Sequence, residues 1–198
     1  MNAFETALSR YLSPEQLTRI RAARVAIAGA GGLGSNVAVA LVRTGFRHLE
    51  ILDKDVVEAS NLNRQDYTLA DLGRPKVACL RARLLSINPD AIVTIHQAEW
   101  TPANAPQYFK EASLMIEAFD NAAVKTSLVE YYAPRMRLVI SGNGMAGLDP
   151  KTEIMVRRVG NIVLVGDGTT SIHDGHPALA PRVLQCAARM AQVVGTNT

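Results

Sequence analysis

A chain of 198 residues that is 48% hydrophobic and 20% charged can bury one sizeable core, and it contains no apolar run of about 18 residues that could span a membrane. Its two cysteines, Cys79 and Cys186, are too few for a disulfide framework or a four-cysteine zinc site. The net charge of +3 comes without runs of lysine or arginine and without a basic, apolar leader, so we expect a cytoplasmic single domain over residues 1–198, with no membrane or nucleic-acid partner.

The hydrophobic pattern predicts strands and helices that alternate along most of the chain. After a helical segment over 1–23, we expect strands at 24–28, 48–52, 91–96, 113–117 and 137–141. The helices expected between them are 33–44, 76–87, 106–111 and 121–132, with a long polar loop over 54–73. Strands at 152–159 and 161–165 predict an antiparallel hairpin, followed by a loop over 166–178 and a closing helix over 180–194. This order predicts an α/β fold: a Rossmann-like, doubly wound, mainly parallel sheet with a C-terminal antiparallel extension.

A glycine-rich turn lies between the first predicted strand and the helix that follows it. Glycine permits positive φ and lets a phosphate approach the backbone, and the N-terminus of the next helix offers N–H groups to that phosphate. Asp53 ends the next strand, where its carboxylate can accept a hydrogen bond from a ribose hydroxyl. We therefore predict an adenine-nucleotide site that includes Gly29, Gly31, Gly32, Leu33, Gly34 and Asp53.

Polar side chains follow other predicted strands, and in a doubly wound sheet such positions converge at one edge. Arg64 and Lys76 suit a triphosphate, the first as a bidentate fork and the second as a point charge. Asp120 suits Mg²⁺, which prefers carboxylate and phosphate oxygens. Asn61 belongs to the same group of side chains, and Asp55 has two open roles, contacting phosphate or metal and capping the loop.

Together these motifs resemble the ThiF/MoeB/HesA family of adenylyltransferases related to ubiquitin-activating enzymes, and most of all the short ThiF-like proteins of thiamine biosynthesis. The resemblance extends from about Arg19 to Arg189. Its motifs are Gly29–Gly34, Asp53-x-Asp55, Ser60-Asn-Leu-Asn-Arg-Gln65, Pro75-Lys76, Phe119-Asp-Asn121, Gly144–Gly147 and Ala180–Val183.

The resemblance implies a homodimeric enzyme that uses ATP and Mg²⁺ to adenylate the C-terminal glycine of a ubiquitin-like, ThiS-like sulfur carrier, with release of pyrophosphate. It implies that Arg64, Lys76 and Asp120 are catalytic and that Asp120 binds or orients the metal. Nucleotide contacts are also implied for Asp55, Asn61 and Asn121. Because an anion attacks another anion, the positive charges of Arg64, Lys76 and the metal would neutralise the charge that accumulates in the transition state. Removing one such contact typically lowers the rate by ~10²–10³.

The chain departs from the family in its cysteines. It lacks the Cys-x-x-Cys pairs that hold zinc in many relatives, so we expect no zinc. Cys186 lies inside an apolar helical pattern and Cys79 in the helix after Lys76, so we expect both to pack in the core rather than form a thioester or mixed disulfide.

Two further segments leave questions open. Larger relatives insert an arginine from the partner's N-terminal helix, for which Arg10, Arg19 and Arg21 are the candidates here, although a solvated helix face explains each. The segment His173–His176 fits no metal-ligand spacing, and a loop that closes over the carrier tail is the preferred hypothesis.

Three alternatives remain open. An NAD-dependent oxidoreductase would share the glycine turn and Asp53 but would not explain Arg64, Lys76 and Asp120 together. A related ATP-dependent enzyme could activate another carboxylate, such as a modified base of tRNA. A non-catalytic module could bind the carrier and keep the nucleotide site for structure alone.

Overall fold

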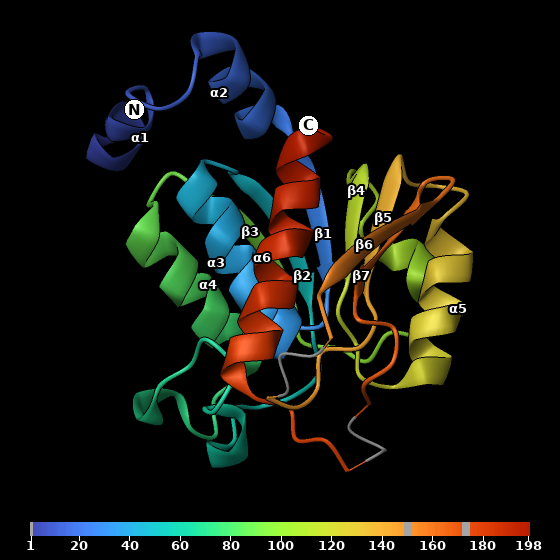
Figure 1. The fold of residues 1–198 in the computed structure, drawn as a ribbon. Helices are drawn as coiled ribbons and strands as arrows, with labels where there is room; N and C mark the ends of the chain where they lie inside the picture. The colour runs from blue at the N-terminus through green and yellow to red at the C-terminus, as the bar shows by residue number, and fades with distance from the viewer. Residues whose placement is uncertain (1, 149–151, 172–174) are drawn as a thin grey trace.

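The computed structural model describes residues 2–148, 152–171 and 175–198, which form one seven-stranded sheet with helices on both faces (Figure 1). In the order across the sheet, the strands are β3 (Ile92–His96), β2 (His48–Leu52), β1 (Arg24–Ala28), β4 (Leu114–Glu117), β5 (Leu138–Gly142), β7 (Ile162–Gly166) and β6 (Met155–Val159). All neighbours are parallel except β6, which is antiparallel to β7. The predicted mainly parallel sheet with an antiparallel extension is therefore confirmed.

The helices are α1 (Ala3–Leu8), α2 (Pro14–Ala22), α3 (Gly32–Thr44), α4 (Lys76–Ile87), α5 (Ala122–Tyr132) and α6 (Ala180–Thr196), with short 3-10 turns η1 (Ala59–Asn61), η2 (Leu69–Asp71) and η3 (Ala105–Gln107). The helix predicted over 106–111 is wrong: only the turn η3 forms there. Its C-cap Tyr108 is extended and Phe109 has a φ of 59°, so the chain leaves the helical region at once. No helix among the described residues is long and apolar enough to cross a membrane.

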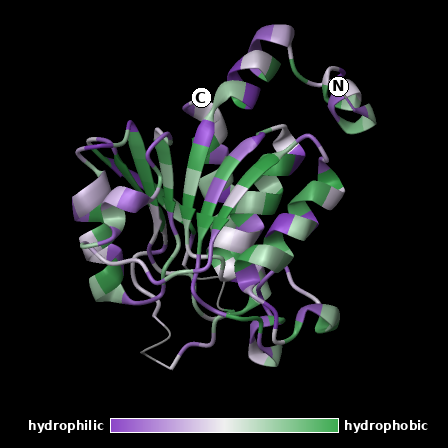
Figure 2. Cartoon of the chain, turned by 180° about the vertical axis from the view of Figure 1, so that it is seen from behind, coloured by the Kyte–Doolittle hydropathy of each residue, from purple (hydrophilic) through white to green (hydrophobic). Residues whose placement is uncertain are grey.

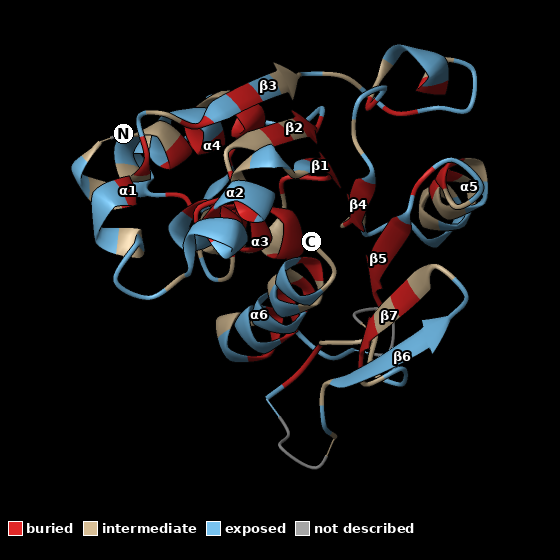
Figure 3. Cartoon of the chain, turned by 90° about the horizontal axis from the view of Figure 1, so that it is seen from above, coloured by how far each residue is buried: buried red, intermediate tan, exposed pale blue. Residues whose placement is uncertain are grey.

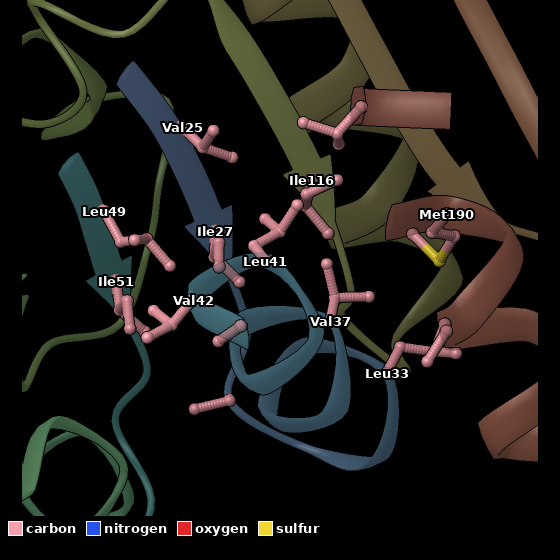
Figure 4. Packing of buried hydrophobic residues seen from close by; sticks show 14 of the residues in the cluster. Val25, Ile27, Leu33, Val37, Leu41, Val42, Leu49, Ile51, Ile116 and Met190 are labelled. Carbon is pink, nitrogen blue, oxygen red and sulfur yellow. The ribbon is translucent and has the colours of Figure 1, made fainter. Parts of the chain in front are cut away.

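Both faces of the central strands β1, β4 and β5 are buried, which explains why their residues are mostly apolar (Figure 2). On one face, Ile51 points toward Val42 of α3 and Ile27 lies close to Leu41, while Met190 of α6 lies beyond Val37 (Figure 4). The alternate strand residues, among them Met115, form a second cluster with α5. Figure 3 shows α3, α4 and α6 on one side of the sheet and α5 on the other.

The strand order reverses at β1, whose neighbours are β2 and β4. The register places Ala28, Leu52 and Glu117 in one row at the carboxyl ends of these strands. Ligands of doubly wound sheets bind at this kind of reversal, so the loops that carry the predicted site residues share one edge.

The two N-terminal helices, α1 and α2, lie at the end of the sheet opposite to the carboxyl ends of β1, β2 and β4 (Figure 1). Glu5 of α1 is fully buried and binds the guanidinium of Arg47, while Asn88 Nδ2 donates to its Oε1 at 3.2 Å. Arg21 also lies 3.6 Å from the Glu5 carboxylate. The arginines of this segment are therefore remote from the glycine turn of their own chain, and any role in a partner's site stays a prediction.

Candidate active site

Packing alone requires two glycines of the turn between β1 and α3. Gly29 has a φ of 100°, and a Cβ there would lie 2.7 Å from the carbonyl oxygen of Ala118. A Cβ on Gly34 would lie 1.8 Å from the carbonyl oxygen of Gly29. The turn is thus pressed against the segment after β4 and against its own helix.

Gly31 and Gly32 line the outer side of the same turn. A Cβ on Gly32 would come within 3.0 Å of Val183 Cγ1 on α6, so close helix packing explains that glycine. At Gly31 the nearest atom to such a Cβ is Gln65 Nε2 at 3.8 Å, an ordinary contact distance. Gly31 is also the N-cap of α3 and caps it without a side chain. A partly exposed backbone without a side chain, at the N-terminus of a 13-residue helix, fits the approach of a phosphate.

Asp53 joins the turn to the end of β2. It is buried, and its Oδ2 accepts a hydrogen bond from Ala30 N–H at 2.6 Å. Its Oδ1 accepts another from Asp55 N–H at 2.8 Å. Burial raises the pKa of Asp53 above its usual value, although these hydrogen bonds and the charge of Lys76 act in the opposite direction.

Lys76 is a buried cation beside Asp53. Its Nζ lies 2.9 Å from Asp55 Oδ2, and its N–H donates to the Asp55 carbonyl at 3.0 Å. Asp55 therefore both shapes the loop and partners the ammonium group. Tyr67, which the sequence did not single out, donates its hydroxyl to the carbonyl oxygens of Ala30 at 2.7 Å and Lys76 at 3.3 Å, and so fixes the helix start against the turn.

Arg64 lies on the loop that faces the glycine turn, with its Cγ 3.5 Å from the position of a Gly32 Cβ. Its guanidinium donates to the carbonyl oxygen of Ser60 at 3.1 Å and to Asn63 Oδ1 at 2.7 Å. Both acceptors are neutral, so the charge of Arg64 remains available to an anion.

Two amide side chains on this loop are buried. Asn61 Oδ1 accepts from Glu58 N–H at 3.1 Å and caps η1. Gln65 is missing from the predicted site, yet it lies beside Gly31, and its Oε1 makes no hydrogen bond to the described residues. A buried amide oxygen without a donor fits a bound ligand that supplies one.

Asp120 and Asn121 follow β4 at the same edge of the sheet. Asn121 Oδ1 accepts from the N–H groups of Ala123 and Val124 and so caps α5. Asp120 is exposed, and its charge raises the pKa of Lys54, after the larger effect of Glu99. No group of three His, Cys, Asp or Glu residues in the described part of the chain could hold a metal ion. One exposed carboxylate does suit Mg²⁺ that takes its other ligands from nucleotide phosphates and water.

A buried charge network behind Asp120 was not predicted. Glu117 at the end of β4 is fully buried and forms an ion pair with Lys125 of α5. Ser141 Oγ of β5 donates to Glu117 Oε2 at 2.6 Å, and Phe119 N–H donates to Oε1 at 2.8 Å. Lys125 Nζ also donates to the Gly142 carbonyl at 3.0 Å. The network fixes the backbone between Glu117 and Asp120, which is the segment that contacts Gly29.

A second unpredicted network holds α6 over the turn. The Arg182 guanidinium binds the Asp167 carboxylate and donates to Thr152 Oγ1 at 2.8 Å. Thr170 donates to Asp167 through its Oγ1 at 2.7 Å and its N–H at 2.8 Å. Burial raises the pKa of Asp167, but the donors from Thr170 and Arg182 outweigh it and hold this pKa well below its usual value.

The expectation that both cysteines pack in the core is confirmed, because both are buried. Cys186 donates to the Val165 carbonyl at 3.2 Å, and burial raises the pKa of its thiol to about 12. Burial also raises the pKa of Cys79. His173 and Asp174 of the proposed closing loop lie outside the described residues.

Comparison with known proteins identifies the family. The chain is 32% identical over 151 residues to the tRNA threonylcarbamoyladenosine dehydratase of Haemophilus influenzae, covering 75% of this chain and 58% of that protein. It is 37% identical over 111 residues to the sulfur carrier protein adenylyltransferase of Thermus thermophilus, covering 56% and 41%. The AMP complex of Escherichia coli tRNA N6-threonylcarbamoyladenosine dehydratase superposes with a TM-score of 0.83 at 25% identity, covering 97% of this chain and 92% of that one.

The chain thus spans less than two thirds of the length of these curated relatives. The match to the family model runs over residues 5–169, which is most of the chain. The chain therefore belongs to the ThiF family.

Proposed function

We propose that this chain uses ATP to adenylate a carboxylate, forming an acyl-adenylate and releasing pyrophosphate. One arrangement carries the proposal: the partly exposed backbone at Gly31 and the start of α3 lie beside buried Asp53, with Lys76 and Arg64 next to them. The relative whose solved structure contains AMP supports an adenine nucleotide as ligand.

Each group has a task in this reaction. Asp53 accepts a hydrogen bond from a ribose hydroxyl, and the α3 N-terminus donates to phosphate oxygens. The acceptor carboxylate is already ionised near pH 7, so the chemistry needs little proton transfer. Its oxygen forms a bond to the α-phosphorus while the bond from that phosphorus to the bridging oxygen breaks, and pyrophosphate leaves with the electron pair. Arg64 and Lys76 stabilise the charge that accumulates there.

Mg²⁺ would be held by Asp120 together with phosphate oxygens, and it would supply further charge neutralisation. Lys76 meets the nucleotide while paired with Asp55, so the ammonium group is already oriented and keeps N–H donors for a phosphate oxygen.

The comparisons favour a tRNA acceptor over a sulfur carrier. Matches to three tRNA threonylcarbamoyladenosine dehydratases cover 68–75% of this chain, whereas the match to a sulfur carrier protein adenylyltransferase covers 56%. A threonylcarbamoyl group carries a free carboxylate, so the proposed chemistry would act on it directly. We therefore place the modified tRNA base first among the acceptors.

The charges around the site favour a second acceptor, the C-terminal glycine of a ubiquitin-like, ThiS-like carrier. Three nearby cations, Lys54, Arg74 and Lys76, each pair with a carboxylate: Glu99, Asp71 and Asp55 respectively. Apart from Arg64, little unpaired positive charge is left there for a phosphate backbone, which basic surfaces normally recognise. If the carrier is the acceptor, the proposal extends to a role in thiamine synthesis and to a homodimeric enzyme, as the resemblance implies.

ATP–pyrophosphate exchange with Mg²⁺ tests the proposal in three parallel reactions: protein alone, with tRNA that bears threonylcarbamoyladenosine, and with a purified carrier that ends in Gly-Gly. Exchange that depends on one addition identifies the acceptor. We expect Arg64→Ala and Asp120→Ala to lower it by ~10²–10³, while Arg189→Ala on the exposed side of α6 leaves it unchanged. Tight ATP binding with no exchange would contradict adenylation of either acceptor, and equal retention of NAD would support the oxidoreductase alternative.

A further inference from the structure

The strand β6 forms one edge of the sheet, and all five of its residues are exposed (Figure 3). The opposite edge differs. There Val93 of β3 is buried, and Arg81 of α4 donates its Nε–H to the Val93 carbonyl at 3.2 Å, which covers part of that edge. An uncovered edge strand is a template for another strand, and proteins usually protect it.

The side chains of β6 are apolar or positively charged. Met155, Val156 and Val159 are 57%, 46% and 61% exposed, and the two remaining residues are Arg157 and Arg158. The register with β7 places Val156 opposite Val165, which belongs to the core cluster of α3 and α6. Because side chains alternate, the apolar residues of β6 lie on both faces of the edge. A partner that covers it must supply apolar side chains above and below the sheet.

The backbone of β6 can accept another strand. The hairpin turns through two residues, Gly160 and Asn161, and Val159 lies opposite Ile162. In such a hairpin the residues that flank the loop bond to each other, and bonded and non-bonded pairs alternate from there. The N–H and C=O groups of Val156 and Arg158 therefore point away from β7.

The charge of the edge selects its partner. Arg158 donates to the Gly160 carbonyl at 3.0 Å and to Asn197 Oδ1 at 3.2 Å, both neutral acceptors. Arg137, near the same corner, also donates to a neutral acceptor, the Asn197 carbonyl. The acidic residue nearest along the chain is Glu153, before the strand begins. Carboxylates opposite the second half of β6 would therefore meet unneutralised guanidinium groups.

Other occupants fit less well. A second copy paired antiparallel over the whole strand brings arginine against arginine, which destabilises a strand pair. A nucleic-acid backbone would bind the arginines but leave the three apolar side chains in water. We propose that β6 is a docking edge to which an extended, acidic strand of a partner protein adds by backbone hydrogen bonding. This inference does not depend on the reaction proposed above.

Two synthetic peptides test the docking edge on the intact protein. One is the hexapeptide Val-Val-Glu-Glu-Val-Val, which in antiparallel pairing places valines on both faces of the edge and glutamates opposite Arg157 and Arg158, and the other has lysine in place of each glutamate. We expect the acidic peptide to slow hydrogen exchange at the amides of Val156 and Arg158 and to bind at least tenfold more tightly than the basic one. Equal binding of the two peptides, or protection elsewhere but not in β6, would overturn the proposal.

Three variants sharpen the test. Val156→Pro removes an outward N–H while sparing the bonds to β7, and it should abolish binding of the acidic peptide. Arg157→Glu should weaken it about tenfold, whereas Arg189→Glu, an equal charge change on α6, should not. Each variant is first checked for an unchanged melting temperature. Peptide-free wild-type protein that sediments as a dimer, and becomes monomeric in Val156→Pro, would assign the edge to a second copy instead.

Discussion

Two aspartates with buried side chains, Asp53 and Asp167, differ in their surroundings. Asp167 receives the Arg182 guanidinium together with the hydroxyl and N–H of Thr170. Asp53 receives two backbone N–H groups, and its nearby cation Lys76 is paired with Asp55. Burial raises the pKa of both, but only at Asp167 do the donors outweigh it.

This difference in hydrogen-bond and ion-pair partners points to a structural role for Asp167 and a ligand-binding role for Asp53. A carboxylate has about four acceptor positions, and at Asp167 the protein itself supplies cation and donors, so that group can serve as a permanent clamp. At Asp53 the two N–H groups leave acceptor capacity in a desolvated place, where a donor from a ligand gains the most. Incomplete pairing, rather than burial, therefore distinguishes the aspartate that we propose to bind nucleotide.

Breaking the Arg182–Asp167 ion pair, the clamp described above, should have the largest effect on the free energy of unfolding. Arg182→Met leaves Asp167 buried without its cation, and removal of one partner of a buried pair costs about 3–5 kcal/mol. Urea unfolding measures the loss. Arg189→Met on the exposed side of α6 is the matched control and should change stability by less than about 0.5 kcal/mol. Similar values for the two variants would contradict the clamp.

A substitution in the buried network of Glu117, Lys125 and Ser141 should have the second-largest effect on stability. Lys125→Met leaves Glu117 with its hydroxyl and N–H donors but no cation, and because Lys125 is partly exposed we expect a loss of about 2 kcal/mol. The KM for ATP should also rise, because the Glu117–Asp120 segment contacts Gly29. Lys125→Arg should restore both values. A stability loss with an unchanged KM for ATP would restrict Lys125 to folding.

Asp53→Asn should affect ligand binding more than folding. An amide still accepts one of the two N–H groups, but the charged acceptor for a ribose hydroxyl is gone, so ATP affinity should fall about tenfold or more. Isothermal titration at neutral pH measures it. An affinity within about twofold of the wild type would remove Asp53 from the nucleotide site.

The free energy of unfolding of Asp53→Asn and Asp167→Asn, measured at several pH values, distinguishes the two aspartates further. The raised pKa of Asp53 means that the folded state binds the proton more tightly than the unfolded chain, so its contribution to stability falls as pH rises above about 4. The lowered pKa of Asp167 has the opposite sign: its contribution is complete above about pH 4 and is lost in stronger acid. Asp53→Asn should therefore gain relative stability with rising pH, and Asp167→Asn should lose it.

The sequence was sufficient for the sheet and for the turn between β1 and α3, because both depend on local patterns. Apolar runs define the strands, and the glycines are needed within a few residues of one another. The sequence did not predict the buried contacts Glu117–Ser141 and Asp167–Arg182, which join residues 24 and 15 positions apart. Charged and hydroxyl residues are common, and only the packed fold shows which of them are buried together.

The short helix predicted before β4 failed for a different reason. Pro106 does lie in the 3-10 turn that starts at Ala105, but buried Phe109 adopts a positive φ and donates its N–H to Glu50 Oε1 at 2.9 Å. Phenylalanine is not typical of that conformation, so local propensity gave no sign of it. Tertiary packing of the Phe109 ring decided the backbone there.

The smallest effect should be at the cysteines. The thiolate is the reactive form, and burial raises the pKa of Cys186 to about 12, so almost no thiolate exists near pH 8. The native protein should therefore react with a disulfide reagent at neither Cys186 nor Cys79, while the urea-unfolded chain should react at both. Cys186→Ala should leave pyrophosphate exchange unchanged. Fast labelling of the native thiol at Cys186, or loss of exchange in that variant, would instead support a covalent step with the acceptor, and the residue would then have to leave the core to reach it.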